Sequence, residues 1–354
     1  MQVGRADRIG VVGAAGQLGT MMVQTAARHG FSVMAFATRR VERWPPEVQF
    51  FEHHRSADWS ALVPSIAQLG AVVIAAPLGS SGLHKLCLEQ GCHIVDVGIS
   101  ADAIRACLAL DGLARARGVN LVVMGGLAPG LSGLLGIDMA RRHPQAALIE
   151  VTLVQSARGT AGAQGVRDML DMLTDRSLAP VIRLHAEPHS TVRHRAFRLP
   201  TAETEFLPSG PFLPAIRYAT LFDSPLLNQL TIGLGGIRAC APSLYRKIRD
   251  LAAVSKAGKA PPASEQIHLI AVAVSREGGV LDTDRHIFVS DYGATAGTAL
   301  ALAKLAVAGK LGAGAGHPAQ LSDWLSVTSQ PSLCDFTWQK DATAPVQVAI
   351  ALNT

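Results

Sequence analysis

Short apolar segments alternate with amphipathic ones over the first 125 residues. Segments such as 71–76 (AVVIAA) are apolar throughout, which is typical of strands buried on both faces of a sheet. Segments such as 17–29 instead carry apolar residues at helical spacing. This alternation predicts βαβ units and a parallel sheet. The predicted strands are 8–12, 32–37, 71–76, 93–97 and 119–124, and the predicted helices are 17–29, 57–68, 81–90 and 101–117.

The hydrophobic pattern changes beyond residue 129. After a predicted helix at 131–142, longer segments follow in which apolar and polar residues alternate, as in strands with one buried face. Helices are predicted among and after them at 165–173, 243–254 and 294–308. This arrangement predicts an α+β region with a mostly antiparallel sheet. Its predicted strands are 148–155, 181–185, 191–199, 229–238, 266–275 and 281–289.

These patterns divide the 354 residues into four parts. We predict a Rossmann dinucleotide-binding domain at 1–128 and an α+β substrate and dimerisation domain at 129–290. A helical segment at 291–330 is expected to return to the Rossmann domain, and the role of the tail at 331–354 is left open. The predicted fold class is therefore α/β, with a Rossmann parallel sheet and a second domain carrying a mostly antiparallel sheet.

Composition narrows the class of protein. Hydrophobic residues make up 49% and aromatic residues 5%, with 34 glycines, which suits close packing of helices on a sheet. The net charge is +5 and the basic residues are scattered, so we expect an anionic small molecule rather than nucleic acid as the partner. No stretch of 18 uncharged apolar residues occurs, so no membrane partner is expected.

The cysteines and the first residues bear on localisation. Five cysteines, an odd number without a C-x-x-C pair, indicate reduced thiols. The chain starts almost directly with a predicted strand, which leaves no room for a secretory signal. We therefore expect a cytoplasmic protein.

Three glycines with the spacing G-x-x-G-x-x-G follow the first predicted strand and open a helix, the context that predicts a dinucleotide site. Gly13 allows the tight turn, Gly16 leaves room for the pyrophosphate, and Gly19 lets the helix pack close to the strand. The helix N-terminus offers N–H groups to the phosphates. The alternative is a βαβ unit whose glycines serve packing only. The predicted loop is Gly13, Ala14, Ala15, Gly16, Gln17, Leu18 and Gly19.

The end of the second predicted strand bears on the choice of cofactor. An NAD site usually carries an acid about 20 residues after the glycine loop, to hold the ribose hydroxyls. This strand ends instead in Thr38, Arg39 and Arg40, and two guanidinium groups can bind a 2′-phosphate. The sequence therefore predicts NADP, with NAD the less favoured cofactor. The alternative is that these arginines form a solvated surface.

Ligands of open parallel sheets bind at the carboxyl ends of the strands. Asp96, near the end of a predicted strand, is a candidate to orient substrate or accept a proton, and the alternative is that it caps the following turn. His84, early in a predicted helix, is a second acid–base candidate, with a capping or surface role as the alternative. The loops add Ala75, Ala76, Pro77 and Gly98 as cofactor candidates, and Ser100, Leu127, Pro129 and Gly130 as substrate candidates.

Other catalytic chemistries find less support. No tyrosine is followed four residues later by lysine, so the pair used by short-chain dehydrogenases is absent. Cys87 and Cys107 fall inside predicted helices, which favours burial over a nucleophilic role. The spacing of His189 and His194 matches no common zinc pattern, and no metal is expected.

Several segments together resemble the saccharopine dehydrogenase (saccharopine reductase-like) oxidoreductase family. They are the glycine loop, VVIAAPLGSSGLHKLCLEQGCHIVDVGIS, VMGGLAPGLSGLL, GTAGAQGVRDML and GTALALAKLAVAGKLGAGAGHPAQL. The resemblance implies a Rossmann domain, an α/β substrate domain, a final helix that returns to the Rossmann domain, NAD(P) and often an amino-acid-derived substrate. It also implies that the glycine loop, 38–40 and 75–77 contact cofactor, and that 96–100 and 127–130 line the nicotinamide and substrate.

We therefore expect an NADP-dependent oxidoreductase that transfers a hydride to or from a C=N or C=O carbon of a small carboxylated substrate. The alternatives are a catalytically inactive NADP-binding sensor and an interaction subunit. Antiparallel sheets of such domains often pair across a two-fold axis, so a homodimer is expected. One or two second-domain arginines are candidates to bind the substrate carboxylate, from Arg158, Arg193, Arg195, Arg198, Arg217 and Arg238.

Overall fold

The structure is a computed structural model. It describes residues 4–53, 58–157, 159, 163–185, 193–207, 213–256 and 266–321, so the predicted tail at 331–354 lies outside the described residues. These residues form two compact units. Unit 1 draws its described residues from Met1–Leu134, Glu205–Leu207 and Tyr292–Phe336. Unit 2 draws its described residues from Leu135–Thr204 and Pro208–Asp291.

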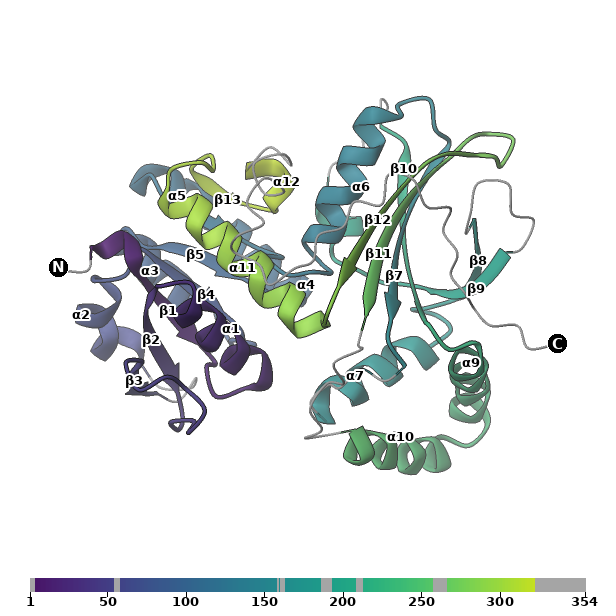
Figure 1. The fold of residues 1–354 in the computed structure, drawn as a ribbon, viewed down its shortest axis with the longest axis horizontal. Coiled ribbons are helices and arrows are strands. Elements are labelled where there is room, and N and C mark those ends of the chain that lie inside the picture. The colour runs from purple at the N-terminus through teal and green to yellow at the C-terminus, as the bar shows by residue number, and fades with distance from the viewer. Residues whose placement is uncertain are drawn as a thin grey trace. The chain divides into compact units, whose positions relative to one another are not determined.

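Unit 1 is built on a seven-stranded sheet in which every neighbouring pair runs parallel (Figure 1). The strand order is β13-β6-β5-β4-β1-β2-β3, and its first six strands in chain order follow the doubly wound Rossmann arrangement. The predicted Rossmann sheet is therefore confirmed. Its strands are β1 (Arg8–Val12), β2 (Ser32–Ala37), β3 (Gln49–Glu52), β4 (Ala71–Ile74), β5 (His93–Asp96), β6 (Asn120–Val122) and β13 (Gly314–Gly316).

Two of the helices predicted for unit 1 are interrupted in the structure. The predicted helix at 57–68 is a 3-10 turn, Trp59–Leu62, followed by the single turn α2 (Val63–Ile66). The predicted helix at 101–117 is broken at residues 109–110 into α4 and α5. The remaining described helices are α1 (Gln17–Arg28), α3 (Gly82–Glu89), α4 (Ala101–Leu108), α5 (Asp111–Arg117), α11 (Asp291–Val307) and α12 (Pro318–Leu321).

Helix α11 is apolar around most of its circumference, and its residues from Tyr292 onward belong to unit 1. Residues from Ala294 to Ala306 are nearly all buried, which explains why its sequence lacks a polar face. After it the chain adds β13 to the edge of the sheet beside β6, with Ala315 opposite Leu121. The last described part of the chain thus completes the Rossmann unit.

Unit 2 contains a six-stranded sheet in the order β12-β11-β7-β10-β9-β8. Only β7 and β10 pair in parallel, and the other neighbours are antiparallel, so the predicted second sheet is confirmed. The strands are β7 (Leu148–Gln155), β8 (Val181–His185), β9 (Arg193–Arg198), β10 (Ala215–Phe222), β11 (Ile267–Val274) and β12 (Val280–Phe288). The helices in this part are α6 (Leu131–Arg142), α7 (Ala163–Thr174), α8 (Glu203–Phe206), α9 (Pro225–Cys240) and α10 (Pro242–Lys256).

The strand predicted at 229–238 is wrong, because this segment lies within helix α9. Ser224 caps the helix by accepting a hydrogen bond from the Leu227 N–H, and Pro225 occupies the first helical position, where its missing N–H costs nothing. These start signals outweigh the alternating pattern of the residues that follow. Strand β10, which was not predicted, takes the place beside β7.

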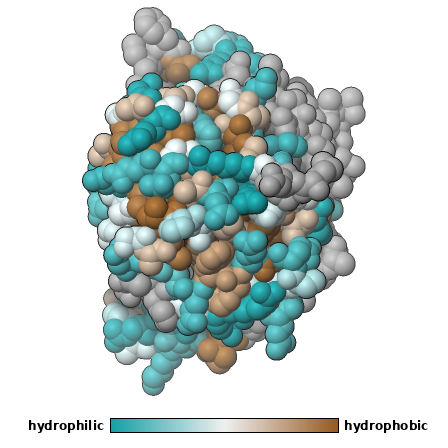
Figure 2. Space-filling model, turned by 90° about the vertical axis from the view of Figure 1, so that its left-hand side faces the viewer, coloured by the Kyte–Doolittle hydropathy of each residue, from teal (hydrophilic) through white to brown (hydrophobic). Residues whose placement is uncertain are grey.

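The surface mixes polar and apolar residues. On the face drawn in Figure 2, hydrophobic residues form patches that hydrophilic residues interrupt. No helix in the described part of the chain is long and apolar enough to cross a membrane. The large apolar residues that are exposed include one in unit 1, Ile99, and several on the helices of unit 2, namely Leu226, Leu230, Leu244, Leu251 and Val254.

Candidate functional site

The central strands of the Rossmann sheet end level with one another. Val12 pairs with Phe36 on one side and with Ile74 on the other, and Ile74 pairs with Asp96. The loops that follow therefore emerge along one edge of the sheet, where ligands of such sheets bind. The structure thus brings the predicted cofactor segments 13–19, 38–40 and 75–77 together at this edge.

The glycine loop has the backbone geometry that its spacing predicts. Gly13 has a φ of +77°, and a side chain there would meet the Cβ of Ala76 at 2.5 Å. A Cβ on Gly19 would lie 2.2 Å from the Gly13 carbonyl oxygen, so helix α1 packs against the turn. Positions 13 and 19 thus require glycine for the packing of the loop itself. A βαβ unit that binds no dinucleotide would have the same requirement.

Gly16 is different, since it is exposed and only the Gly13 carbonyl oxygen lies near the position of its absent Cβ, at 3.3 Å. It is the N-cap of α1 and offers no capping side chain. In the described part of the chain, the N–H groups of Gln17 and Leu18 donate no hydrogen bond. An uncovered helix N-terminus behind a glycine is the arrangement that receives a pyrophosphate, and the residues present fit a dinucleotide.

The end of β2 presents basic residues and no acid. Thr38, Arg39 and Arg40 are all exposed. Arg40 donates a hydrogen bond to the Val48 carbonyl oxygen at 3.3 Å, whereas no bond to the Arg39 guanidinium is found among the described residues. Arg39 is therefore the better placed of the two to bind a phosphate.

The predicted substrate loops fall into two groups. Pro77, Ile99 and Ser100 are exposed, and the Ser100 side chain makes no capping bond although it precedes α4. Leu127, Pro129 and Gly130 are instead buried. The second group therefore shapes the backbone of the loop after β6 and offers little side-chain surface to a substrate.

The loop after β6 is held by backbone bonds. The Gly125 N–H donates to the Asp96 carbonyl oxygen at 2.9 Å, and the Leu127 N–H donates to the Thr295 hydroxyl at 3.4 Å. Gly130 has a φ of +133°, and a Cβ there would lie 2.3 Å from two carbonyl oxygens. The glycines after β6 thus serve a tight turn, whereas the sequence predicts that this loop contacts substrate.

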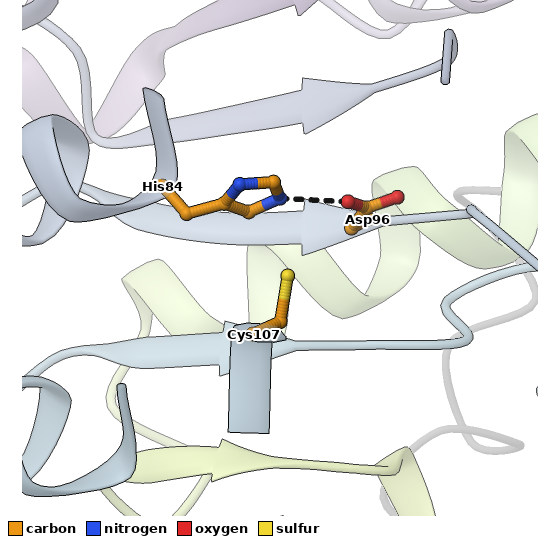
Figure 3. A group of neighbouring side chains, drawn as sticks. All are labelled: His84, Asp96 and Cys107. Atoms are coloured by element: carbon orange, nitrogen blue, oxygen red, sulfur yellow. Dashed lines mark hydrogen bonds and ion pairs between the residues drawn. The ribbon is translucent and has the colours of Figure 1, made fainter. Parts of the chain in front are cut away.

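His84 and Asp96 bond directly to each other (Figure 3). The Nε2 atom of His84 lies 2.7 Å from Oδ2 of Asp96, and the other carboxylate oxygen accepts the Gly98 N–H at 2.6 Å. The His84 side chain is 3% exposed and that of Asp96 is 14% exposed. Asp96 therefore both caps the following turn and pairs with His84. Of these two side chains, only that of Asp96 reaches solvent.

Cys107 on α4 completes this cluster. It is buried, and its sulfur points toward the pair in Figure 3. Burial and the nearby Asp96 carboxylate raise the pKa of Cys107 to about 12. The sequence predicts only that this residue lies inside a helix, because no spacing along the chain links it to His84 or Asp96.

Two of the candidate carboxylate-binding arginines are paired with acidic residues within unit 2. Arg217 pairs with Glu150, which is 1% exposed. Arg238 pairs with Asp175 at 3.0 Å. Arg195 and Arg198 are exposed. Arg158 and the side chain of Arg193 lie outside the described residues.

Three solved structures are similar to this chain. A DAP dehydrogenase of C. glutamicum in complex with DAP matches with a TM-score of 0.51 and 14% identity, covering 92% of this chain and 98% of that one. An engineered D-amino acid dehydrogenase bound to NADP+ gives 0.48 and 13%, covering 90% and 95%. The WlbA (WbpB) dehydrogenase of Thermus thermophilus, with NAD and UDP-GlcNAcA, gives 0.41 and 15%, covering 94% and 96%.

Sequence comparison adds no family. No family model matches the chain, and no curated protein matches it significantly. At identities this low a structural likeness concerns the fold alone. The chain shares with the C. glutamicum dehydrogenase a two-part fold with a Rossmann sheet and a second sheet.

Proposed function

We propose that the protein is an NADP-dependent oxidoreductase of the saccharopine dehydrogenase-like type. Its substrate would be a small, carboxylated, amino-acid-derived molecule with a C=N or C=O carbon. The observation that carries the proposal is the exposed Gly16 turn at the same sheet edge as the acid-free end of β2 with Arg39. NADP(H), when bound, supplies the hydride chemistry. The fold shared with a dehydrogenase is consistent with this assignment.

Each residue at this edge of the sheet would contact a different part of the cofactor or substrate. The N-terminus of α1 and Gly16 would hold the pyrophosphate, and Arg39 the 2′-phosphate. The exposed Pro77 would lie along the nicotinamide ribose, beside the loop that carries Ile99 and Ser100. Ser100 offers a hydroxyl to a polar substrate and Ile99 an apolar surface, 70% exposed, that would exclude water.

Asp96 is the proposed group for orienting substrate or accepting its proton. It is the partly exposed member of the pair with His84, so a substrate would contact the carboxylate and not the imidazole. His84 acts in this proposal as a positioning residue, because its bond fixes the orientation of the carboxylate.

One observation favours a second function, an NADP-binding sensor without turnover. Both Asp96 oxygens already accept bonds inside the unit, from His84 and the Gly98 N–H. A carboxylate whose two oxygens are both engaged in this way has no oxygen left free to contact a substrate. The sensor would bind NADPH but would not oxidise it with any substrate.

Direct titration tests the proposal. We expect NADPH to bind at least about tenfold more tightly than NADH, a difference of about 1.4 kcal/mol. Equal binding, or tighter binding of NADH, would contradict the NADP assignment. NADPH oxidation is then followed with a panel of 2-keto acids, with and without ammonia or an amine. Turnover supports the oxidoreductase, and tight binding without any turnover supports the sensor.

We also propose that the protein is a homodimer formed through unit 2. Leu244, Leu251 and Val254 lie seven and three residues apart on α10, which places them on one face of the helix. They are 50%, 71% and 65% exposed. Such a row of apolar side chains is typical of a surface that another protein covers.

A further inference from the structure

Three metal-binding side chains of unit 1 meet at one point. His84 comes from α3, Asp96 from the end of β5 and Cys107 from α4. The imidazole nitrogen, a carboxylate oxygen and the thiol sulfur all lie within 4.8 Å of one another (Figure 3). Each comes from a different helix or strand, so the tertiary fold brings them together and no single turn does so.

The spacing of these atoms suits a small cation. Zinc binds nitrogen and oxygen at about 2.0–2.2 Å and sulfur at about 2.3 Å, so tetrahedral ligands lie roughly 3.3–3.8 Å apart. The three atoms here span distances from 2.7 Å, between His84 and Asp96, up to the 4.8 Å limit of the cluster. Side-chain movements of about an ångström would bring them to the geometry of a metal site.

Cys107 provides an independent indication. Its side chain is 2% exposed, and within the described residues its thiol has no hydrogen bond. The sulfur is nevertheless aimed at the imidazole and carboxylate, neither of which it bonds (Figure 3). A thiolate at this position would be repelled by the nearby Asp96 carboxylate. A divalent cation among the three groups reverses that repulsion and deprotonates the thiol.

We propose that His84, Asp96 and Cys107 form a binding site for one divalent cation of the zinc class. Imidazole and thiolate ligands select zinc over magnesium or calcium, which prefer oxygen. Three protein ligands leave the fourth tetrahedral position to water. Binding breaks the S–H bond of Cys107 and releases that proton to solvent. The proton by which His84 Nε2 now bonds Asp96 moves to Nδ1, so that Nε2 is free to bind the metal.

The site does not require the proposed oxidoreductase function. It does share Asp96 with that function, and a bound cation would occupy the oxygen that now faces His84. Metal loading would then withdraw Asp96 from substrate. Cys107 takes no part in the proposed handling of cofactor or substrate, so its substitution separates the two proposals.

Cobalt titration of the chelator-treated, full-length protein tests the site. We expect one Co²⁺ per chain, a near-ultraviolet thiolate-to-cobalt charge-transfer band, displacement of cobalt by Zn²⁺, and release of one proton per ion. Cys107→Ser should lose the band and bind at least tenfold more weakly, with NADPH binding unchanged. Cys87→Ser, which removes an equally buried thiol on α3, should keep the band.

Several outcomes would overturn the site. They are no saturable binding at stoichiometric cobalt, binding without the thiolate band, and a band that persists in Cys107→Ser. If Cys107→Ser does not fold, as judged by circular dichroism, His84→Gln keeps the thiol and tests the nitrogen ligand instead. Cobalt affinity unchanged in His84→Gln would equally exclude the site. Failure of NADPH to bind would contradict the proposed function and leave the metal result intact.

Discussion

The Nε2 atom of His84 lies 2.7 Å from Oδ2 of Asp96, and both side chains lie largely inside unit 1. His84→Ala leaves that oxygen of Asp96 without its partner, so we expect a loss of about 1–3 kcal/mol of unfolding free energy. Urea denaturation at neutral pH measures it. Lys85→Ala, at the neighbouring exposed position of α3, serves as the control and should change stability by less than about 0.5 kcal/mol. Equal stability of both variants would show that the pair contributes nothing.

Substitution of Gly19 should damage the dinucleotide loop. A methyl group there would meet the Gly13 carbonyl oxygen, so α1 must move away from the turn. We expect Gly19→Ala to weaken NADPH binding by at least about tenfold and to lower the melting temperature. Gly112→Ala on α5 is the matched control, because nothing lies within 4 Å of the added Cβ, and it should bind NADPH normally. Normal binding by Gly19→Ala would remove the loop from the proposed site.

Arg39 should distinguish the two nicotinamide cofactors. Arg39→Ala removes a charge-assisted contact to a 2′-phosphate, which is worth about 1.5–3 kcal/mol, or a loss of roughly ten- to a hundredfold in NADPH affinity. NADH affinity should not change, since NADH lacks that phosphate. Arg117→Ala, at an exposed position elsewhere in unit 1, controls for the lost charge. A parallel loss of both cofactors in Arg39→Ala would indicate a structural role.

His268 should make unit 2 sensitive to acid. Burial and the neighbouring Arg285 lower the pKa of His268 to about 4, whereas an unfolded histidine titrates near 6.5. Between these values the unfolded chain binds more protons, so unfolding free energy should fall as the pH drops from about 6.5 toward 4. Denaturation at a series of pH values measures this slope, and His268→Gln should flatten it. A slope unchanged in His268→Gln would assign the acid sensitivity to other groups.

The exposed face of α10 should control assembly. Light scattering is expected to give a dimer for the unmodified protein, and Leu251→Glu should shift it toward monomer, because a charge cannot be buried without a partner. Leu178→Glu alters another exposed leucine of unit 2 and should leave the dimer intact. A monomeric unmodified protein at micromolar concentration would refute the dimer altogether.

Helix α9 and strand β10 of unit 2 could not be predicted from the hydrophobic pattern. The alternation at 229–238 favoured a strand, but Ser224 and Pro225 before it start helix α9. Asn228 then bonds both backbone groups of Phe222 at 2.8 Å, which holds the helix against the end of β10. That contact joins α9 to β10. The parallel partner of β10 is β7, which is more than 60 residues away in the chain, so the pairing of β10 depends on tertiary packing and not on local sequence.

The features that could be predicted from the sequence are those that depend on residues close together in the chain. The glycine spacing, the apolar strands and the acid-free end of β2 all act through local backbone conformation and charge, so the Rossmann sheet and its glycine turn could be predicted. Tertiary structure alone decided which distant groups meet. It paired His84 with Asp96, added Cys107 to them and buried Leu127, because strand order and helix packing set these distances and no spacing along the chain records them.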